Sequence, residues 1–478
     1  MSSHSTLAHL LALHYESGGP WLRHLVVGGV IVTSVLVVPT RPQGTLLALG
    51  AAAAVLILLR WPPLGLLALV FASLLLPYGL STGTGTDLNL AVLLPPVLVA
   101  LWVIAALVRD RRFAGAGWSP YLASPAVPLL ALCLVATAAF VHGSRPLLSF
   151  ASTAPLPAQM GGLGIFWIAA MAFFLAGYRA PALPWLPRLT WLYLALAGFY
   201  VFGRLLPGGL LPVDRYYVGA ATANSLFWVW AVALAAGQSL SNKDLRIAWR
   251  LALAGLALAA LCVAFFQARG WVSGWLPALI ALVATLWMGS PRLAFAASLL
   301  GGLALLFDQA IVFRAIESLL RGENTYSLVT RLEAWRVLAE VIKVSPILGL
   351  GPANYYWYTP LFPILGWRVN FSSHNNYVDV AAQTGILGLA CLLWFALSMA
   401  RLALRTRDTA PAGFERGYVQ AAFGGLVGTM AAGMLADWFL PFVYNIGLSG
   451  FRMSLIGWVF LGGLVALARH RRGQPQRL

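Results

Sequence analysis

Apolar segments of about 17 to 25 residues recur along almost the whole chain, and they constrain its fold more than any other feature. Charged residues make up only 9% of the chain, whereas soluble globular proteins have about 25%. So few charges cannot cover a water-facing surface, which excludes soluble enzymes, secreted disulfide scaffolds and disordered chains. The sequence predicts an all-α, polytopic integral membrane protein with about 12 to 14 transmembrane helices.

The apolar runs define fourteen candidate spans. They cover residues 24–40, 44–59, 62–78, 88–108, 120–141, 160–178, 187–206, 222–240, 250–267, 271–289, 293–308, 376–400, 418–437 and 447–467. We therefore expect spans 1–11 within residues 1–308, a large loop over 309–375 that carries the candidate motifs, and the remaining spans within 376–478. Within the loop, the pattern predicts a short amphipathic helix over Ala310–Leu320 and a second helix over Thr325–Val344.

The basic residues predict the orientation of the chain. With the N-terminus in the cytoplasm, 19 of the 31 Lys and Arg residues fall in inside segments, as the positive-inside rule requires. Both termini are then cytoplasmic and the 309–375 loop is periplasmic. The net charge of +17 does not indicate a nucleic-acid partner, because the basic residues are scattered singly and form no patch.

The cysteines and acidic residues indicate no metal or disulfide chemistry. Cys133, Cys262 and Cys391 each lie inside an apolar run, without a CxxC motif, so we expect three small buried side chains. The acidic residues predicted to lie outside show no ligand spacing. We therefore expect a protein without a metal or another cofactor.

A histidine at the start of a predicted span is the strongest candidate for chemistry. His374 lies in a Ser-Ser-His-Asn-Asn run at 372–376, and Asp379 lies about one turn into the following helix. A neutral imidazole tuned by a nearby carboxylate can serve as a general base. A histidine in this position can equally be a capping or interfacial residue, and the sequence leaves both interpretations open.

Three external arginines differ in their local partners. Arg336 has Glu333 three residues before it and Glu340 four residues after it, so we expect Arg336 to be structural. Arg331 has no acidic residue at these spacings, and Arg269 lies in a very short turn far from any acid. Two external arginines without local partners favour an anionic ligand such as phosphate, although a nonlocal salt bridge or snorkelling is an equal alternative.

The segment before His374 is rich in aromatic rings and glycine. Aromatic side chains such as these line sugar sites, but they also form the interfacial belt of membrane proteins, which we favour here. They are Tyr355, Tyr356, Trp357, Tyr358 and Trp367. Residues 349–352, Gly-Leu-Gly-Pro, are predicted to form a turn.

Several short motifs occur in the order of a known family. Residues 330–335 read TRLEAW, 345–351 read SPILGLG, 374–377 read HNNY and 383–389 read QTGILGL. Together they resemble the R-x-x-x-W helix, P-x-x-G-x-G turn, H-N pair and G-x-x-G element of the bacterial O-antigen ligase and O-antigen polymerase superfamily. Arg269-Gly270 is similar to the family's Ser-Arg-Gly turn, with Ala268 replacing the serine. Asn224 is similar to its span-opening asparagine.

The resemblance implies a transferase for lipid-linked glycans. Such proteins move a glycan from undecaprenyl pyrophosphate to a hydroxyl acceptor at the periplasmic face of the inner (cytoplasmic) membrane. They use no metal or nucleotide sugar, and attack opposite the pyrophosphate inverts the anomeric centre. A ligase transfers to lipid A–core, which we slightly favour, whereas an O-antigen or exopolysaccharide polymerase transfers to a second lipid-linked glycan.

The resemblance also implies roles for individual residues. Arg269 and Arg331 hold the pyrophosphate, and His374 acts as a base on the acceptor hydroxyl or helps to position it. Residues in supporting positions are Asn224, Arg215, Asn375, Asp379 and Trp335. The alternative from another class is a membrane transporter or flippase, which would place ionisable residues in mid-span and interrupt spans in two matching halves.

Overall fold

The computed structural model divides the chain into two compact units, Met1–Pro62 and Pro63–Leu478. The structure describes residues 50, 53–54, 56–58, 61, 63–81, 87–108, 125–179, 182–206, 210–267, 271–307 and 323–473. The predicted spans 24–40 and 44–59 therefore lie outside the described residues, apart from a few helical positions between 50 and 58. The account below concerns the second unit.

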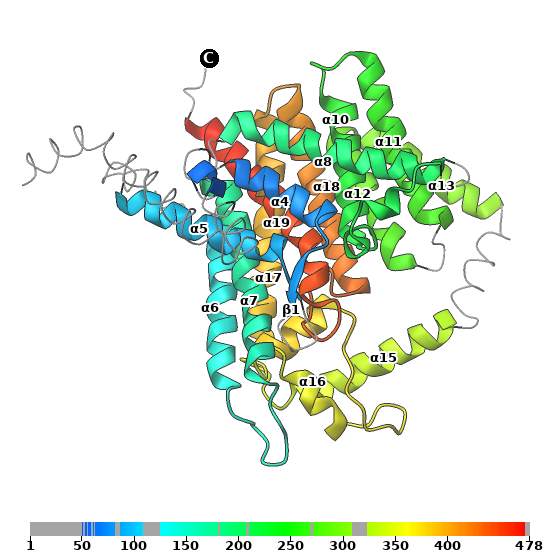
Figure 1. Ribbon diagram of the computed structural model, residues 1–478. Helices are drawn as coiled ribbons and strands as arrows, with labels where there is room; N and C mark the ends of the chain where they lie inside the picture. The colour runs from blue at the N-terminus through cyan, green and yellow to red at the C-terminus, as the bar shows by residue number, and fades with distance from the viewer. Residues whose placement is uncertain are drawn as a thin grey trace, which may run out of the picture. The chain divides into compact units, whose positions relative to one another are not determined.

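The second unit is built almost entirely of helices (Figure 1). Its first half contains α4 (Leu64–Leu75), α5 (Leu90–Val108), α6 (Ala126–His142), α7 (Leu156–Phe174), a π-helical turn (Leu175–Arg179), α8 (Ala182–Leu205), a 3-10 turn (Val213–Arg215), α9 (Gly219–Thr222) and α10 (Ser225–Ser241). Its second half contains α11 (Ile247–Gln267), α12 (Val272–Gly289), α13 (Pro291–Phe307), α15 (Glu323–Ile342), α16 (Tyr355–Tyr358), a 3-10 turn (Thr359–Leu361), α17 (Asn376–Thr409), α18 (Phe414–Leu435) and α19 (Gly447–Gly473). Strands β1 (Gly79–Ser81) and β2 (Asp87–Asn89) form one antiparallel hairpin.

The helices confirm the predicted all-α membrane architecture. Six described helices are long and apolar enough to cross a membrane: Leu156–Tyr178, Ile247–Phe266, Val272–Gly289, Asn376–Thr409, Phe414–Leu435 and Gly447–Arg471. Each of the other six predicted spans within the second unit coincides with one of α4, α5, α6, α8, α10 and α13. In the 309–375 loop, the helix predicted over Thr325–Val344 is present as α15, whereas Ala310–Leu320 lies outside the described residues.

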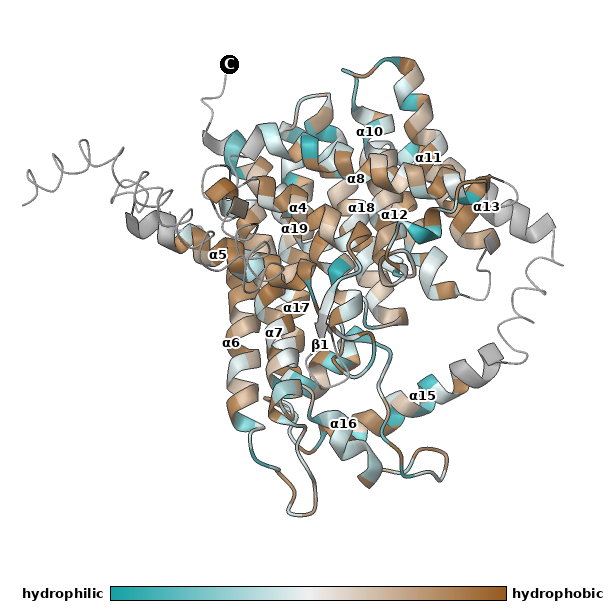
Figure 2. Ribbon diagram, in the orientation of Figure 1, coloured by the Kyte–Doolittle hydropathy of each residue, from teal (hydrophilic) through white to brown (hydrophobic). Residues whose placement is uncertain are grey.

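Burial separates central helices from peripheral ones. The most apolar window of α19 is 100% buried within the protein, whereas that of α11 is only 33% buried. On α11 the large side chains of Leu251, Leu258 and Phe266 are all more than half exposed. Figure 2 shows hydrophobic residues over most of the helical bundle, with hydrophilic residues gathered near α15, α16 and the connecting loops. A helix exposed on an apolar face requires a lipid environment.

Several basic connecting segments meet at one end of the bundle. Arg471 at the C-terminal end of α19 pairs with Glu415 at the start of α18, with 2.5 Å between the charged atoms. The backbone N–H of Gly413, between α17 and α18, donates to the carbonyl of Ser241 after α10 (3.0 Å). These segments are among those that the positive-inside rule assigns to the cytoplasm, and α15 and α16 lie at the opposite end (Figure 1).

Small residues allow α18 to pack tightly between α10 and α12. A Cβ on Gly417 would come within 2.8 Å of the carbonyl oxygen of Gly237 in α10. A Cβ on Gly428 would come within 2.7 Å of Ala281 in α12. Helices in a membrane associate through such close backbone approach, because lipid offers no hydrophobic drive between them.

The long helix α17 is broken at Gly385, whose φ of +67° lies in the left-handed region. The break leaves the last carbonyl groups of the first helical segment without partners in the helix. A neighbouring loop supplies them: the N–H of Leu350 donates to Ala382 (2.9 Å) and that of Gly351 donates to Gln383 (3.0 Å). Backbone groups at this apolar position are therefore hydrogen-bonded without water.

The same loop, residues 346–351, also serves the segment of α17 after the break; we call it the splint loop. The N–H of Ile386 donates to the carbonyl of Pro346 (2.9 Å). The loop lies so close that a Cβ on Gly349 would come within 2.5 Å of the Gln383 backbone. The predicted glycine turn is thus present, and it holds together both sides of the break.

The prediction of three buried cysteines is correct only for Cys133. Cys391 is half-buried and Cys262 is exposed. Periodicity cannot distinguish these positions, because the lipid-facing side of a membrane helix is as apolar as its buried side.

We predict that Gly385→Ala destabilises the protein by about 2 kcal/mol or more. Alanine is disfavoured in the left-handed region, and its Cβ would collide with the carbonyl oxygen of Ile347, disrupting the hydrogen bonds of the splint loop. Thermal unfolding in detergent measures the effect as a lower Tm. Gly255→Ala in α11, where a Cβ meets nothing within 4 Å, is the control and should leave the Tm unchanged or raise it. If Gly385→Ala had the same Tm as Gly255→Ala, the break in α17 and its hydrogen bonds to the splint loop would not be important for stability.

Candidate functional site

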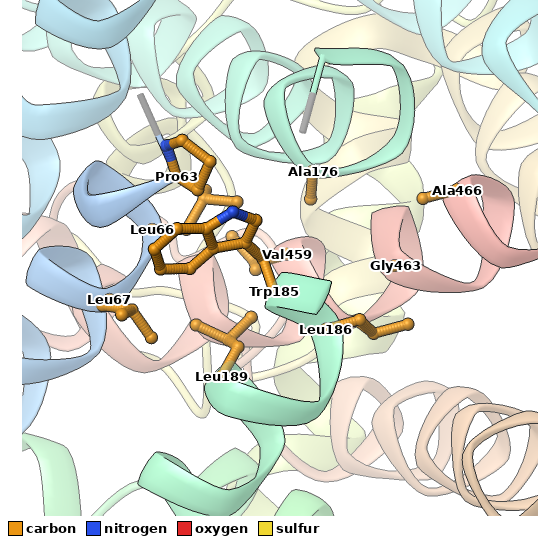
Figure 3. A pocket seen from close by; sticks show the side chains of 10 residues that line it. All are labelled: Pro63, Leu66, Leu67, Ala176, Trp185, Leu186, Leu189, Val459, Gly463 and Ala466. Atoms are coloured by element: carbon orange, nitrogen blue, oxygen red, sulfur yellow. The ribbon is translucent and has the colours of Figure 1, made fainter. Parts of the chain in front are cut away.

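A pocket beside the C-terminal half of α19 is lined by apolar side chains and glycine alone. It lies between α4, α8, α19 and the π-helical turn, with Leu66, Trp185 and Val459 among its lining (Figure 3). None of its lining residues can titrate or carry charge, so it offers no catalytic group. The polar residues singled out by the sequence lie elsewhere, at the start of α17 and around the end of α18.

His374 has an unusual backbone conformation immediately before α17. Its φ of +50° is in the left-handed region, which costs a non-glycine residue of the order of 1–3 kcal/mol. The following residue, Asn375, caps the helix: its side-chain oxygen accepts from the N–H groups of Tyr377 (2.9 Å) and Val378 (3.3 Å). The cap directs the chain into α17, and the turn before it holds the imidazole at the helix end.

The buried carboxyl group of Asp379 stabilises this turn. Asp379 is fully buried, and one of its oxygens accepts hydrogen bonds from Ser373 Oγ (2.6 Å) and Tyr355 OH (2.5 Å). Ser373 Oγ also accepts from the N–H of Asn375 (2.8 Å). Trp335 on α15 donates from its indole nitrogen to the carbonyl of Ser373 (2.8 Å). Side chains from three helices, α15, α16 and α17, therefore fix the residue next to His374.

The side chain of His374 is hydrogen-bonded to the segment between α18 and α19. Its Nδ1 lies 3.0 Å from Nδ2 of Asn445, and the same Nδ2 donates to Oδ1 of Asp437. Asp437 is fully buried, and its other oxygen accepts from the N–H of Phe442 (2.7 Å). Burial raises the pKa of Asp437 to about 6, although its hydrogen bonds favour the charged form.

Arg331 comes from α15 to the same place. Its Nη1 donates to the carbonyl of Leu435 at the end of α18 (2.9 Å), where the negative end of the helix dipole favours a cation. Burial lowers the pKa of Arg331, and the charge of Asp437 partly offsets this. Burial, and then the positive charge of Arg331, lower the pKa of His374. The site thus combines a neutral imidazole with a partly desolvated guanidinium.

The aromatic residues before His374 divide into buried and accessible ones. Tyr355 stacks on Phe442 with ring centroids 4.4 Å apart, and Tyr355 and Tyr358 are both fully buried. The prediction of an interfacial belt is therefore wrong for these two tyrosines, which form a small core under the turn. Trp367 is 72% exposed, as a belt residue would be.

Arg336 behaves as the sequence predicts. It pairs with Glu333 at 2.8 Å and is exposed, so it is a surface ion pair on α15. Glu340, the second predicted partner, instead pairs with Lys343 at 2.7 Å. Arg331 and Arg336 lie on the same helix, yet only Arg331 is brought to His374.

Arg269 lies outside the described residues. The chain is described again at Trp271, whose ring lies edge-on to that of Trp438, with centroids 6.1 Å apart. Trp438 follows Asp437 directly in the sequence. The start of α12 is therefore next to the segment that carries Asp437.

Two further predicted residues have other roles or places. Asn224 is fully buried and caps α10 by accepting from the N–H of Leu226 (2.9 Å), while its Nδ2 donates to the carbonyl of Gly450 (3.1 Å). It therefore joins α10 to α19, as a structural residue would. Arg215 is exposed in the 3-10 turn before α9, and no hydrogen bond connects it with His374 or Arg331.

The sequence did not predict that Asp437, Asn445 and Tyr355 belong to the hydrogen-bonded group around His374. The signal for Asp437 was an acidic residue at the end of a predicted span, which is rare enough to need a partner. Asn445 carries no such signal, because an amide in a connecting segment is unremarkable until its neighbours are known. Across the described residues, no group of three or more His, Cys, Asp or Glu side chains is close enough to hold a metal ion.

Comparison with known protein families agrees with the order of motifs in the chain. Residues 254–393 match the family model described as O-antigen ligase. This segment of the chain is similar to the O-antigen ligase family. This match supports the O-antigen ligase and polymerase superfamily and a glycosyltransferase of that kind, and it favours a transferase over a transporter or flippase. No curated protein matches the chain. The matched segment includes Arg269, Arg331 and His374, whereas Asp437 and Asn445 lie beyond its end.

We predict that Tyr355→Phe lowers the stability of the protein by about 1.5 kcal/mol. The change removes one hydrogen bond to the buried carboxylate of Asp379, which then loses a donor that no water can easily replace. The Tm in detergent measures the loss. Tyr356→Phe, at a half-buried neighbour, is the matched control and should change the Tm much less. A smaller loss of Tm in Tyr355→Phe than in Tyr356→Phe would show that the hydrogen bond from Tyr355 to Asp379 contributes little to stability.

Proposed function

We propose that this protein transfers a glycan from undecaprenyl pyrophosphate to a hydroxyl of lipid A–core, at the periplasmic face of the bacterial inner membrane. The reaction needs no metal ion and inverts the anomeric centre. The O-antigen ligase match supports the class of reaction, and the arrangement of Arg331 and His374 supports the site.

The partly buried guanidinium of Arg331 is the observation that carries this proposal. Its hydrogen bond to Leu435 uses one of five N–H donors, and no carboxylate forms an ion pair with it among the residues that the structure describes. A partly desolvated guanidinium with free donors suits a planar or tetrahedral oxyanion such as phosphate. His374 lies near enough for this charge to lower its pKa.

The chemical step needs little besides charge stabilisation and positioning. The acceptor oxygen attacks the anomeric carbon, and the bond from that carbon to the pyrophosphate oxygen breaks with its electron pair remaining on pyrophosphate. Arg331, together with Arg269, stabilises the charge that develops there. In this proposal His374, which is close to Arg331, contacts the reacting groups beside the pyrophosphate.

The position of the site supports a reaction on the outer side of the membrane. The start of α17, together with α15 and α16, lies at the end of the bundle opposite the C-terminal end of α19 (Figure 1), and His374 comes two residues before α17. The C-terminal end carries the basic segments that the positive-inside rule assigns to the cytoplasm. A glycan on a polyprenyl lipid would therefore be used on the periplasmic side.

We predict that Arg331→Ala reduces transfer about 100-fold or more while the protein stays folded. The loss follows from removing a cation that stabilises the leaving group. The measurement is turnover of reconstituted protein with an undecaprenyl-pyrophosphate glycan, and Arg269→Ala should behave alike. Arg336→Ala is the matched control, since this arginine is on the same helix and pairs with Glu333 at the surface, so it should keep nearly full activity. Normal turnover in the Arg331 variant would refute the pyrophosphate role.

We predict that the wild-type protein prefers lipid A–core when it competes with a second lipid-linked glycan. Mass analysis of the product reports the acceptor, and elongated lipid-linked glycan as the main product would make the protein a polymerase instead. The same assay with a metal chelator should proceed at an unchanged rate. Inhibition that Mg²⁺ reverses would contradict the metal-free reaction.

A further inference from the structure

One amide nitrogen connects His374 with a buried acid. Nδ2 of Asn445 lies 3.0 Å from Nδ1 of His374 and also donates to Oδ1 of Asp437. A side-chain amide nitrogen carries two hydrogens and can serve both neighbours at once. If Asp437 accepts one of these two hydrogens, the other faces Nδ1 of His374, and this determines which ring nitrogen of the imidazole carries the proton.

Asp437 is an acceptor at neutral pH. Its Oδ2 accepts from the N–H of Phe442 at 2.7 Å, a hydrogen bond that favours the carboxylate. Its pKa of about 6 leaves it ionised above neutrality. An ionised carboxylate has no proton to donate, so the atom of Asn445 that faces it must be the amide nitrogen and not the carbonyl oxygen.

The second hydrogen of the Asn445 amide therefore points to Nδ1 of His374. Nδ1 can accept it only if it carries no proton. The imidazole is neutral because burial and the charge of Arg331 lower its pKa. In a neutral imidazole with a bare Nδ1, the proton is on Nε2.

We infer that Asp437 and Asn445 are positioning residues that hold His374 as the Nε2–H tautomer, so that it donates a hydrogen bond to a phosphate oxygen and does not act as a general base. The identity of the phosphate rests on the proposed function, whereas the tautomer rests on the hydrogen bonds of Asn445 together with the ionised state of Asp437 and the neutral state of the imidazole. A neutral donor beside Arg331 adds to the stabilisation of an oxyanion without adding a second charge that would repel the guanidinium.

The reaction balances without a protein base. The acceptor oxygen bonds to the anomeric carbon as the bond to pyrophosphate breaks, and the electron pair stays on the departing oxygen. Because attack comes from the face opposite the pyrophosphate, the hydroxyl proton leaves to solvent water once the new bond has formed, and the departing pyrophosphate takes up a proton from solvent. His374 keeps its Nε2 proton throughout. The titratable groups that face the turn of His374 are Arg331 on α15, Asp437 after α18 and Asp379 one turn into α17.

The tautomer can be observed directly. NMR of the reconstituted protein with ¹⁵N-labelled histidine, at mildly alkaline pH, should show one imidazole with a protonated Nε2 and a bare Nδ1 that is missing from the spectrum of His374→Gln. A protonated Nδ1 at this residue would overturn the inference. The result does not depend on activity, so a wild-type protein that shows this tautomer but transfers no glycan would refute the proposed function alone.

Turnover distinguishes a donor from a base. A glutamine amide can donate from nearly the position of Nε2 but cannot accept a proton at neutral pH. His374→Gln should therefore keep transfer within about tenfold of wild type, whereas His374→Ala should lose about 100-fold or more. If glutamine is as inactive as alanine, with an unchanged Tm, His374 acts as a base and the inference fails.

The positioning role has its own test in Asn445→Ala. Without the amide, Nδ1 is free to take the proton, so the Nε2–H signal should weaken and turnover should fall about tenfold. Ser449→Ala, an exposed residue of the same region, is the control and should stay within about twofold. An Asn445→Ala protein with the wild-type NMR signal and wild-type turnover would exclude the positioning role. This variant avoids Asp437, whose replacement would also remove a buried acceptor from Phe442.

Discussion

The hydrogen bonds across the break in α17 stabilise the end of the bundle that contains α15, α16 and the candidate site. A broken helix exposes backbone donors and acceptors that an apolar environment cannot satisfy. The splint loop, residues 346–351, provides both kinds of partner, with Leu350 and Gly351 as donors and Pro346 as acceptor. Because the same loop leads directly into α16, the break in α17 also determines where Tyr355 and its neighbours lie.

A continuous set of polar contacts extends from the break to the candidate site. Tyr355 and Ser373 hold Asp379, and Asn375 caps α17 while its Nδ2 donates to the carbonyl of Met434 near the end of α18 (3.2 Å). Most of these buried polar groups are thereby paired, which favours keeping them in an apolar interior, whereas the second carboxyl oxygen of Asp379 has no hydrogen-bond partner among the described residues. The strained backbone of His374 is maintained by these contacts, and the imidazole reaches Asn445 as a result.

The two arginines of α15 show which contacts sequence spacing can predict and which it cannot. Arg336 was assigned to the surface because Glu333 is its local partner, and the structure confirms that ion pair. For Arg331 the sequence supplied only the absence of local acids. Its actual neighbours, Leu435 and the charge of Asp437, are about a hundred residues away in the chain, so no spacing rule connects them. The roles of Arg331 and His374 in transfer remain predictions.

The sequence by itself determined the architecture. Apolar runs must become helices in a membrane, since only helices satisfy every backbone group within a single segment, and the described helices coincide with the predicted spans. The motifs also indicated the O-antigen ligase family, whose model matches residues 254–393. Only the tertiary structure decided which polar residues meet. Asp437 and Asn445 lie beyond the matched segment, and they join His374 because α17 and α18 pack side by side. Such contacts depend on how helices pack in three dimensions, which hydrophobic periodicity does not encode.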